Sequence, residues 1–385
     1  MKANRTIVAV VAVLMSVSLM SGADETAIRV MPRVNMADSG VQRVLNSWID
    51  SLDAWRGLGS VATGGHRDGP FATGSQHQIM SDWFGQSEFV LKTFPPTILS
   101  VEQRPGSATT PEYHRIWTIR TMFSSTEPET HHVIPLGIMR TQFGERVDGA
   151  LEALDPISEH TARWTSTTVG RLTFLIPPDG HLDMKRARMA DDFITTLSRT
   201  FDVSPPSNIT MYVAPDRDAM CELFGLEYYA FPPSGLAYPE AGMMMTSLGD
   251  PLHYHELVHM TIHDLEARTY PILREGVATW LGGSTNVSTT ELLATLMQRN
   301  GAAPLPSLEE LMSGEALDQE AQYILAAVIA DAVHELHGIA GIKMLLTVRD
   351  ANEAIQMSRH LLGFSQTNTS SRIDPFIESM LSKTR

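Results

Sequence analysis

The sequence predicts an α+β fold. Three observations predict it. An amphipathic helix over 41–55 precedes a group of strand-like runs rich in β-branched and aromatic residues. A second strand–helix–strand series covers 171–214, and helical periodicity dominates after Gly283. Runs of strands with helices segregated around them are typical of α+β domains.

The first 23 residues have the features of a signal peptide. Lys2 and Arg5 give a positive start, an apolar run covers 7–20, and Ser21-Gly22-Ala23 forms a small-residue cleavage site. The apolar run is short for a membrane span, and an uncleaved anchor is the alternative. No later segment approaches 18 consecutive apolar residues, so we expect an exported, periplasmic or extracellular protein with no membrane association after the signal is removed.

Length and composition limit the number of domains and the kinds of partner that the rest of the chain can have. Because 385 residues exceed a usual single core, we expect two domains, at 24–165 and 166–385. The net charge of −15 argues against a nucleic-acid partner. Cys221 is the only cysteine, which excludes an intramolecular disulfide and favours a bacterial envelope. With no paired Cys–His signature, Cys221 is interpreted as a small buried hydrophobe.

The first domain is expected to pack one helix on a curved antiparallel sheet. Five apolar residues share one face of the helix: Val44, Leu45, Trp48, Ile49 and Leu52. The predicted strands are 97–102, 114–123 and 133–143, separated by turn-rich pieces. The element order and the run Ile116–Phe123 resemble the NTF2-like (cystatin-like) domain. That resemblance implies a binding or scaffolding role and assigns no site residue.

The second domain carries the motif H-E-x-x-H at His255–His259. On a helix, positions i and i+4 share one face, so both imidazoles can bind one Zn²⁺ ion. Glu256 stands beside the first ligand and can serve as general base to a bound water. Asp250-Pro251 reads as an N-cap followed by a helix that runs from Leu252.

A catalytic zinc ion takes a third protein ligand and leaves one position open. His263 lies one helical turn beyond His259, where it reaches the metal poorly. Glu275 lies on a second predicted helix, which starts near Pro271 and ends at Gly282-Gly283. A tight loop between the helices would let Glu275 close the set, so Glu275 is the favoured ligand, with one zinc ion per chain.

These two helices resemble the gluzincin metallopeptidases, the thermolysin-like peptidase MA group. In that group H-E-x-x-H is followed by a ligand glutamate in a Glu-Gly-x-Ala context, here Glu275–Ala278. The resemblance implies that His255, His259 and Glu275 bind zinc. It also implies that Glu256 is both base and proton shuttle. Thermolysin-type enzymes place an Asp four residues past the ligand glutamate to support a histidine ligand; Thr279 stands there, so Asp264 is the candidate support.

The same resemblance implies a small sheet before the zinc helices and a helical half after them. Met243-Met244-Met245 is a candidate for an edge strand that hydrogen-bonds extended substrate, the alternative being a buried strand. Related aminopeptidases carry Gly-x-Met-Glu-Asn before the zinc helix. The corresponding stretch, 242–246, lacks that Glu and Asn, which favours an endopeptidase or a peptidase of narrow specificity.

The oxyanion of amide hydrolysis needs a donor besides the metal. Tyr323 resembles a Tyr that related gluzincins present from this region, and His334 and His337 are alternatives. The sequence therefore predicts a secreted zinc metallopeptidase that acts on a peptide or protein substrate. Two alternatives stay open: a zinc-containing binding module without catalysis, and a zinc hydrolase of a non-peptide amide or ester.

Overall fold

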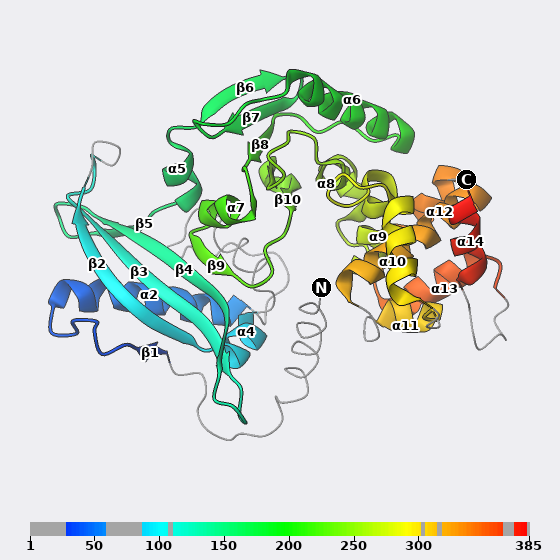
Figure 1. Ribbon diagram of the computed structural model, residues 1–385. Helices are drawn as coiled ribbons and strands as arrows, with labels where there is room; N and C mark the ends of the chain where they lie inside the picture. The colour runs from blue at the N-terminus through cyan, green and yellow to red at the C-terminus, as the bar shows by residue number, and fades with distance from the viewer. Residues whose placement is uncertain are drawn as a thin grey trace. The chain divides into compact units, whose positions relative to one another are not determined.

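The computed structural model describes residues 28–58, 87–106, 111–301, 305–313, 318–364 and 373–382. The predicted signal peptide lies outside the described residues. The chain has mixed α+β structure and two sheets (Figure 1), so the predicted α+β class is confirmed at that level. It divides into two compact units. Unit 1 comprises Met1–Arg163 and Asp216–Pro233, and unit 2 comprises Trp164–Pro215 and Ser234–Arg385.

The described strands of unit 1 form one six-stranded sheet in the order β1-β2-β3-β4-β5, with β9 paired to another part of β4. Their bounds are β1 Arg29–Val30, β2 Pro96–Pro105, β3 Arg115–Thr126, β4 Val133–Glu145, β5 Leu151–Ala153 and β9 Leu226–Tyr229. The pairing is antiparallel except between β1 and β2. The three predicted strands of this region are present as β2, β3 and β4, each longer than predicted.

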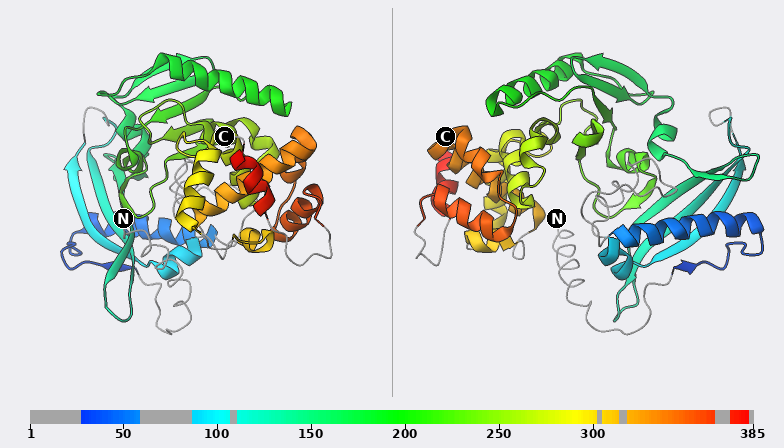
Figure 2. Two further views of the ribbon diagram at one scale, coloured as in Figure 1. Left: turned by 45° about the vertical axis from the view of Figure 1, so that its right-hand side comes forward. Right: turned by 180° about the vertical axis from the view of Figure 1, so that it is seen from behind.

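Helix α2, Ser39–Leu58, lies against one face of this sheet (Figure 2). The carboxylate of Asp38 starts the helix by accepting the backbone N–H groups of Gly40 and Val41 at 2.7 and 3.1 Å. Trp48 is buried, and its indole N–H donates to the hydroxyl of Thr121 on β3 at 2.8 Å. The predicted apolar face of the helix therefore packs on the sheet, and the hydrogen bond from Trp48 to Thr121 satisfies the one polar group that this indole buries.

The segment 216–233 returns from the middle of unit 2's sequence to the sheet of unit 1. It forms α7, Arg217–Leu223, and β9, and the backbone N–H of Arg140 on β4 donates to the Gly225 carbonyl at 2.6 Å. Helix α5, Pro156–Thr161, and α4, Ser87–Thr93, complete the described helices of this unit. The pairing joins residues about 90 positions apart, which strand patterns alone do not reveal.

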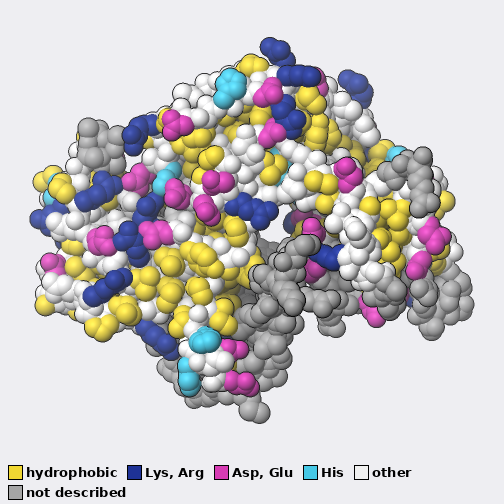
Figure 3. Space-filling view, in the orientation of Figure 1, with side chains coloured by type: hydrophobic (Ala, Val, Ile, Leu, Met, Phe, Trp, Pro, Cys, Tyr) yellow, Lys and Arg dark blue, Asp and Glu magenta, His cyan; other side chains and the backbone are white. Residues whose placement is uncertain are grey.

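Charged side chains of unit 1 pair across the sheet. Arg120 bonds Glu102 at 2.6 Å and Glu227 at 2.8 Å, and Arg104 bonds Glu159 at 2.9 Å. Figure 3 shows Lys and Arg side chains interspersed with Asp and Glu over the described residues on the face in view. The acidic excess of the chain is therefore not gathered into one patch on that face.

Unit 2 opens with a five-stranded sheet in the order β10-β11-β8-β7-β6. The bounds are β6 Thr165–Val169, β7 Leu172–Ile176, β8 Ile209–Val213, β10 Gly235–Tyr238 and β11 Met243–Thr246. Strands β7, β8 and β11 are parallel, whereas β6 and β10 run antiparallel to their neighbours at the two edges. Helix α6, Met184–Phe201, packs its buried face on this sheet.

This order corrects the expectation for Met243–Met245. These residues form β11, which is paired on both sides and wholly buried, so the alternative of a buried strand is the correct one. The edge strand on this side is β10, which pairs only with β11 among the described strands. A 3₁₀ turn, η1 Pro239–Ala241, joins the two strands.

The rest of unit 2 is helical, as predicted. The bounds are α8 Tyr254–Glu266, α9 Pro271–Gly282, α10 Thr289–Asn300, α11 Leu308–Ser313, α12 Gln319–Leu345, α13 Ala351–Leu361 and α14 Asp374–Ser382. Helix α12 is interrupted at Gly338, where the backbone φ is 62°. Among the described residues, α12 alone is long and apolar enough to cross a membrane, yet 56% of its most apolar window is buried inside the protein.

Candidate metal centre

Helix α8 carries the H-E-x-x-H residues and begins at Tyr254, so its N-cap position, His253, lies three residues after the predicted N-cap Asp250. The Asp250 carboxylate accepts the Leu252 N–H at 2.9 Å and forms an ion pair with Arg186 at 2.6 Å. Asp250 therefore connects the segment that precedes α8 to helix α6. The residue at the N-cap position is His253, which makes no capping bond with its side chain.

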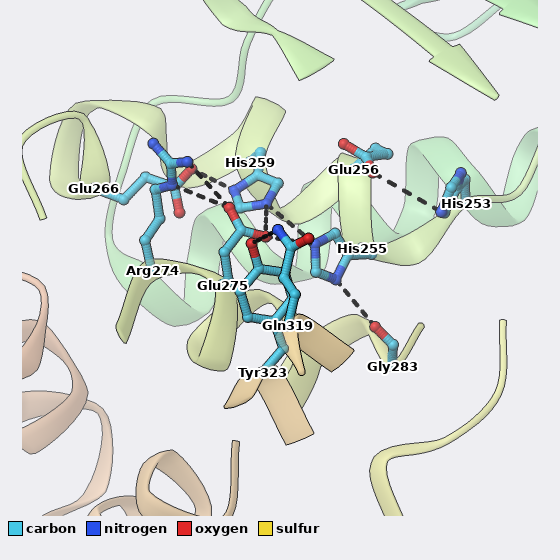
Figure 4. Close-up of polar contacts among 10 residues, drawn as sticks. All are labelled: His253, His255, Glu256, His259, Glu266, Arg274, Glu275, Gly283, Gln319 and Tyr323. Carbon is cyan, nitrogen blue, oxygen red and sulfur yellow. Dashed lines mark hydrogen bonds and ion pairs between the residues drawn. The ribbon is translucent and has the colours of Figure 1, made fainter. Parts of the chain in front are cut away.

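His255, His259 and Glu275 lie together, as the sequence predicts. The Nε2 atoms of the two imidazoles are 3.2 Å apart, and Oε2 of Glu275 lies 3.2 Å from His255 Nε2 and 3.5 Å from His259 Nε2. All three side chains are nearly buried, and Figure 4 shows them pointing toward one another from α8 and α9. This group of one carboxylate and two imidazoles could hold a metal ion.

The second nitrogen of each imidazole has its own acceptor. His255 Nδ1 lies 3.1 Å from the Gly283 carbonyl oxygen, and His259 Nδ1 lies 2.6 Å from Oε1 of Glu266. Because these acceptors take the Nδ1 hydrogens, Nε2 is the nitrogen that each ring directs at the shared space, and it offers a lone pair when the ring is neutral. Asp264, the expected support, is exposed and is not the residue that bonds a histidine.

Glu266 was missed because its sequence distance from His259 gives no signal. It lies seven residues further along α8, and Ile262 between them has non-helical torsions, φ −107° and ψ 19°. A kink of this kind changes which side chains share a face, and nothing in the local sequence marks it. A search for any carboxylate within two turns after His259 would have found both Asp264 and Glu266.

Arg274 holds the other oxygen of Glu275. Its guanidinium donates from Nε and Nη2 to Oε1 at 3.2 and 3.1 Å, which leaves Oε2 directed at the histidines. Burial acts to raise the pKa of Glu275, but His259 and His255 hold it well below its ordinary value. Burial acts to lower the pKa of His259, but Glu266 and Glu275 hold it well above its ordinary value.

Glu256 is buried beside the cluster, and burial raises its pKa. His253 Nε2 lies 4.0 Å from its Oε1, and His253 Nδ1 lies 3.2 Å from the Thr246 hydroxyl (Figure 4 for the first contact). Burial, followed by His255 and His259, lowers the pKa of His253 to about 3, so this imidazole is neutral at physiological pH. Sequence reasoning gave His253 no role.

The remaining candidates lie apart from the three donor atoms. His263 is not in the cluster, and its Nε2 lies 4.0 Å from Glu240. His334 packs on Trp280 with ring centroids 4.9 Å apart, and His337 Nε2 lies 2.7 Å from the Leu361 carbonyl.

Tyr323 on α12 lies near Glu275 in Figure 4, and its hydroxyl accepts the Gln319 amide N–H at 2.6 Å. Burial, reinforced by the charge of Glu275, raises the pKa of Tyr323 to about 12. The phenol therefore stays protonated at physiological pH, and it can donate its own hydrogen.

Close backbone packing sets the position of the two ligand-bearing helices. A Cβ atom on Gly282 would lie 2.5 Å from the backbone nitrogen of His255, and one on Gly276 would lie 2.5 Å from Cβ of Ala326 on α12. The loop after α9 returns to the start of α8, where the Asn286 amide donates to the Leu252 carbonyl at 2.6 Å. Glycines thus allow α9 to approach both α8 and α12.

Among known proteins, no protein-family model matches this chain, and no curated protein matches it significantly. The resemblance to gluzincins therefore rests on the residues of the site.

Proposed function

We propose that the protein is a zinc-dependent metallopeptidase of the gluzincin type. The observation that carries the proposal is the convergence of two imidazole nitrogens and one carboxylate oxygen, with Glu256 in the same helix. A structural zinc site closes all four positions with protein ligands, whereas three ligands leave one position for reaction. The donor set therefore favours catalysis over a purely structural zinc ion.

The spacing of the donor atoms supports zinc. Ligands about 2.0–2.1 Å from a tetrahedral ion lie about 3.3–3.4 Å from one another. The three measured separations are 3.2, 3.2 and 3.5 Å. Mixed imidazole and carboxylate donors with bonded Nδ1 atoms are a common zinc environment. These residues fit a zinc ion with little rearrangement.

When bound, zinc would polarise the peptide carbonyl and lower the pKa of a water molecule. The Glu256 carboxylate accepts the proton of the attacking water and delivers it to the leaving amine. Its burial-raised pKa suits a group that must both accept and return a proton. The Tyr323 hydroxyl is the proposed donor to the developing oxyanion, since Gln319 occupies its oxygen and leaves its hydrogen available.

The edge strand β10 supports an extended peptide as substrate. Among the described strands β10 pairs only with β11, so its other side could pair with substrate backbone. A Cβ on Gly235 would lie 2.6 Å from Cγ of Glu256, so this strand runs directly beside the proposed base. The absence of a Gly-x-Met-Glu-Asn strand favours cleavage within chains. The predicted signal peptide would export the protein. The first domain, by its resemblance to NTF2-like domains, would bind a partner or substrate.

Cleavage of a mixed peptide library, read by mass spectrometry, tests this function. The wild-type protein loaded with zinc should cut internal bonds, and Glu256→Gln should bind zinc equally and cut none. Equal cleavage by both proteins would contradict the role of Glu256. Zinc binding without cleavage by either would favour a binding module or a non-peptide substrate.

A further inference from the structure

We propose that His253 is a positioning residue for Glu256 and that Thr246 sets the tautomer in which it acts. The inference rests on the proposed function, because it concerns the general base of that reaction. It assigns a role to two buried polar residues, His253 and Thr246, that the proposed mechanism leaves unused.

Glu256 has a polar neighbour, His253, that can orient it. Among the described residues, His253 Nε2 is the only ionisable nitrogen within 4.0 Å of its carboxylate, at 4.0 Å from Oε1. This separation is longer than a hydrogen bond, but catalytic contacts in free enzymes are commonly long and tighten in complexes. A modest rotation of the Glu256 side chain closes the gap, provided that Nε2 carries a hydrogen.

The hydrogen bonds of Thr246 place that hydrogen on Nε2. Thr246 is fully buried, and its oxygen accepts the Leu248 N–H at 3.2 Å. Its other partner among the described residues is His253 Nδ1, at 3.2 Å. A buried hydroxyl donates where an acceptor is present, and the amide cannot accept. The hydroxyl therefore donates to Nδ1, and the ring carries its hydrogen on Nε2, facing Glu256.

The edge strand holds this pair in place. A Cβ on Gly235 would lie 2.3 Å from Cε1 of His253 and 2.6 Å from Cγ of Glu256, so β10 packs on both side chains at once. The Ser247 hydroxyl donates to the Ser234 carbonyl at 2.9 Å and fixes that strand. Thr246, His253 and Glu256 thus lie in a row beside β10, in which Thr246 donates to His253 and His253 directs its Nε2 hydrogen at Glu256.

Nitrogen NMR of histidine-labelled protein tests the tautomer without any activity. The metal-free wild type and Thr246→Ser, which keeps the hydroxyl, should both show His253 with hydrogen on Nε2. Thr246→Val should shift hydrogen toward Nδ1. Hydrogen on Nδ1 in the wild type would overturn the proposal.

Kinetics test the positioning role once cleavage has been observed. His253→Phe should keep zinc and KM but lower kcat by roughly 10- to 100-fold, the usual effect of losing an orienting partner. His253→Gln, whose amide can donate from near the Nε2 position, should recover part of that loss. His263→Phe on the same helix is the matched control and should behave as wild type. An unchanged kcat in His253→Phe would overturn the role, whereas no cleavage by the wild type would instead count against the proposed function.

Discussion

The Glu266 carboxylate accepts the Nδ1 hydrogen of His259 at 2.6 Å, within the kinked end of the same helix. This bond turns the Nε2 atom of His259 toward His255 and Glu275. A carboxylate behind an imidazole also makes that imidazole a stronger metal ligand. Asp264 was the candidate for this support, and Glu266 on the same helix makes the bond instead.

Replacing Glu266 should weaken metal binding. Glu266→Ala removes the acceptor of His259, and we expect metal affinity to fall by roughly 10- to 100-fold. Competition with a chromophoric chelator measures the change. Asp264→Asn is the matched control, because Asp264 is exposed and two residues away. Equal losses in the two variants would contradict the specific role of Glu266.

Metal binding should release protons. In the metal-free protein Glu266 and Glu275 hold the pKa of His259 well above its ordinary value, so the ligand is protonated near neutral pH. Zinc must displace that proton, and its apparent affinity should rise about tenfold per pH unit below this pKa. Calorimetry in buffers of different ionisation enthalpy measures the protons released. A buffer-independent enthalpy would show that His259 is already neutral.

The metal-free protein should be most stable at mildly acidic pH. His259 has a raised folded pKa, so its contribution is complete below its unfolded value near 6.5 and is lost as pH rises through the folded pKa. Glu275 has a lowered folded pKa, so its contribution is complete above 4.5 and is lost as pH falls. Thermal unfolding across this range should show a maximum that Glu275→Gln reduces. A metal-free protein with no such maximum would show that His259 and Glu275 do not form a charged pair in the folded state.

The contact between α8 and α9 should not tolerate a methyl group at Gly282. A Cβ there would lie 2.5 Å from the His255 backbone nitrogen and 2.7 Å from the Tyr254 carbonyl carbon. Backbone cannot move aside as a flexible side chain can, so we expect Gly282→Ala to cost about 1–3 kcal/mol of unfolding free energy. It should also weaken metal binding, because His255 must shift. Urea unfolding with and without zinc separates the effects, and unchanged stability would contradict the close approach.

Local patterns predicted most elements of this fold. Apolar periodicity located α2 and the helices after Gly283, and the start and stop signals Pro271 and Gly282-Gly283 located α9. The H-E-x-x-H spacing placed His255 and His259 on one helical face. Sequence reasoning placed Glu275 by resemblance and loop length, and the structure brings it to the same point. These successes share a cause, since each depends on neighbours within a few turns of chain.

The missed features depend on contacts between distant segments. The pairing of β9 with β4 and the interior place of β11 follow from sheet order, which local alternation does not encode. His253 acquires its proposed role only because Thr246 and Gly235 reach it from strands. Glu266 required the kink at Ile262. Such features need tertiary structure before their chemistry can be recognised.

The most direct test of the metal centre is the zinc content of His259→Ala beside that of His263→Ala. The two histidines lie four residues apart on α8, and only His259 shares the donor cluster with His255 and Glu275. We expect about one zinc ion per chain in the wild type and in His263→Ala, and close to none in His259→Ala. Full zinc occupancy in His259→Ala, or loss of zinc in His263→Ala alone, would contradict that expectation.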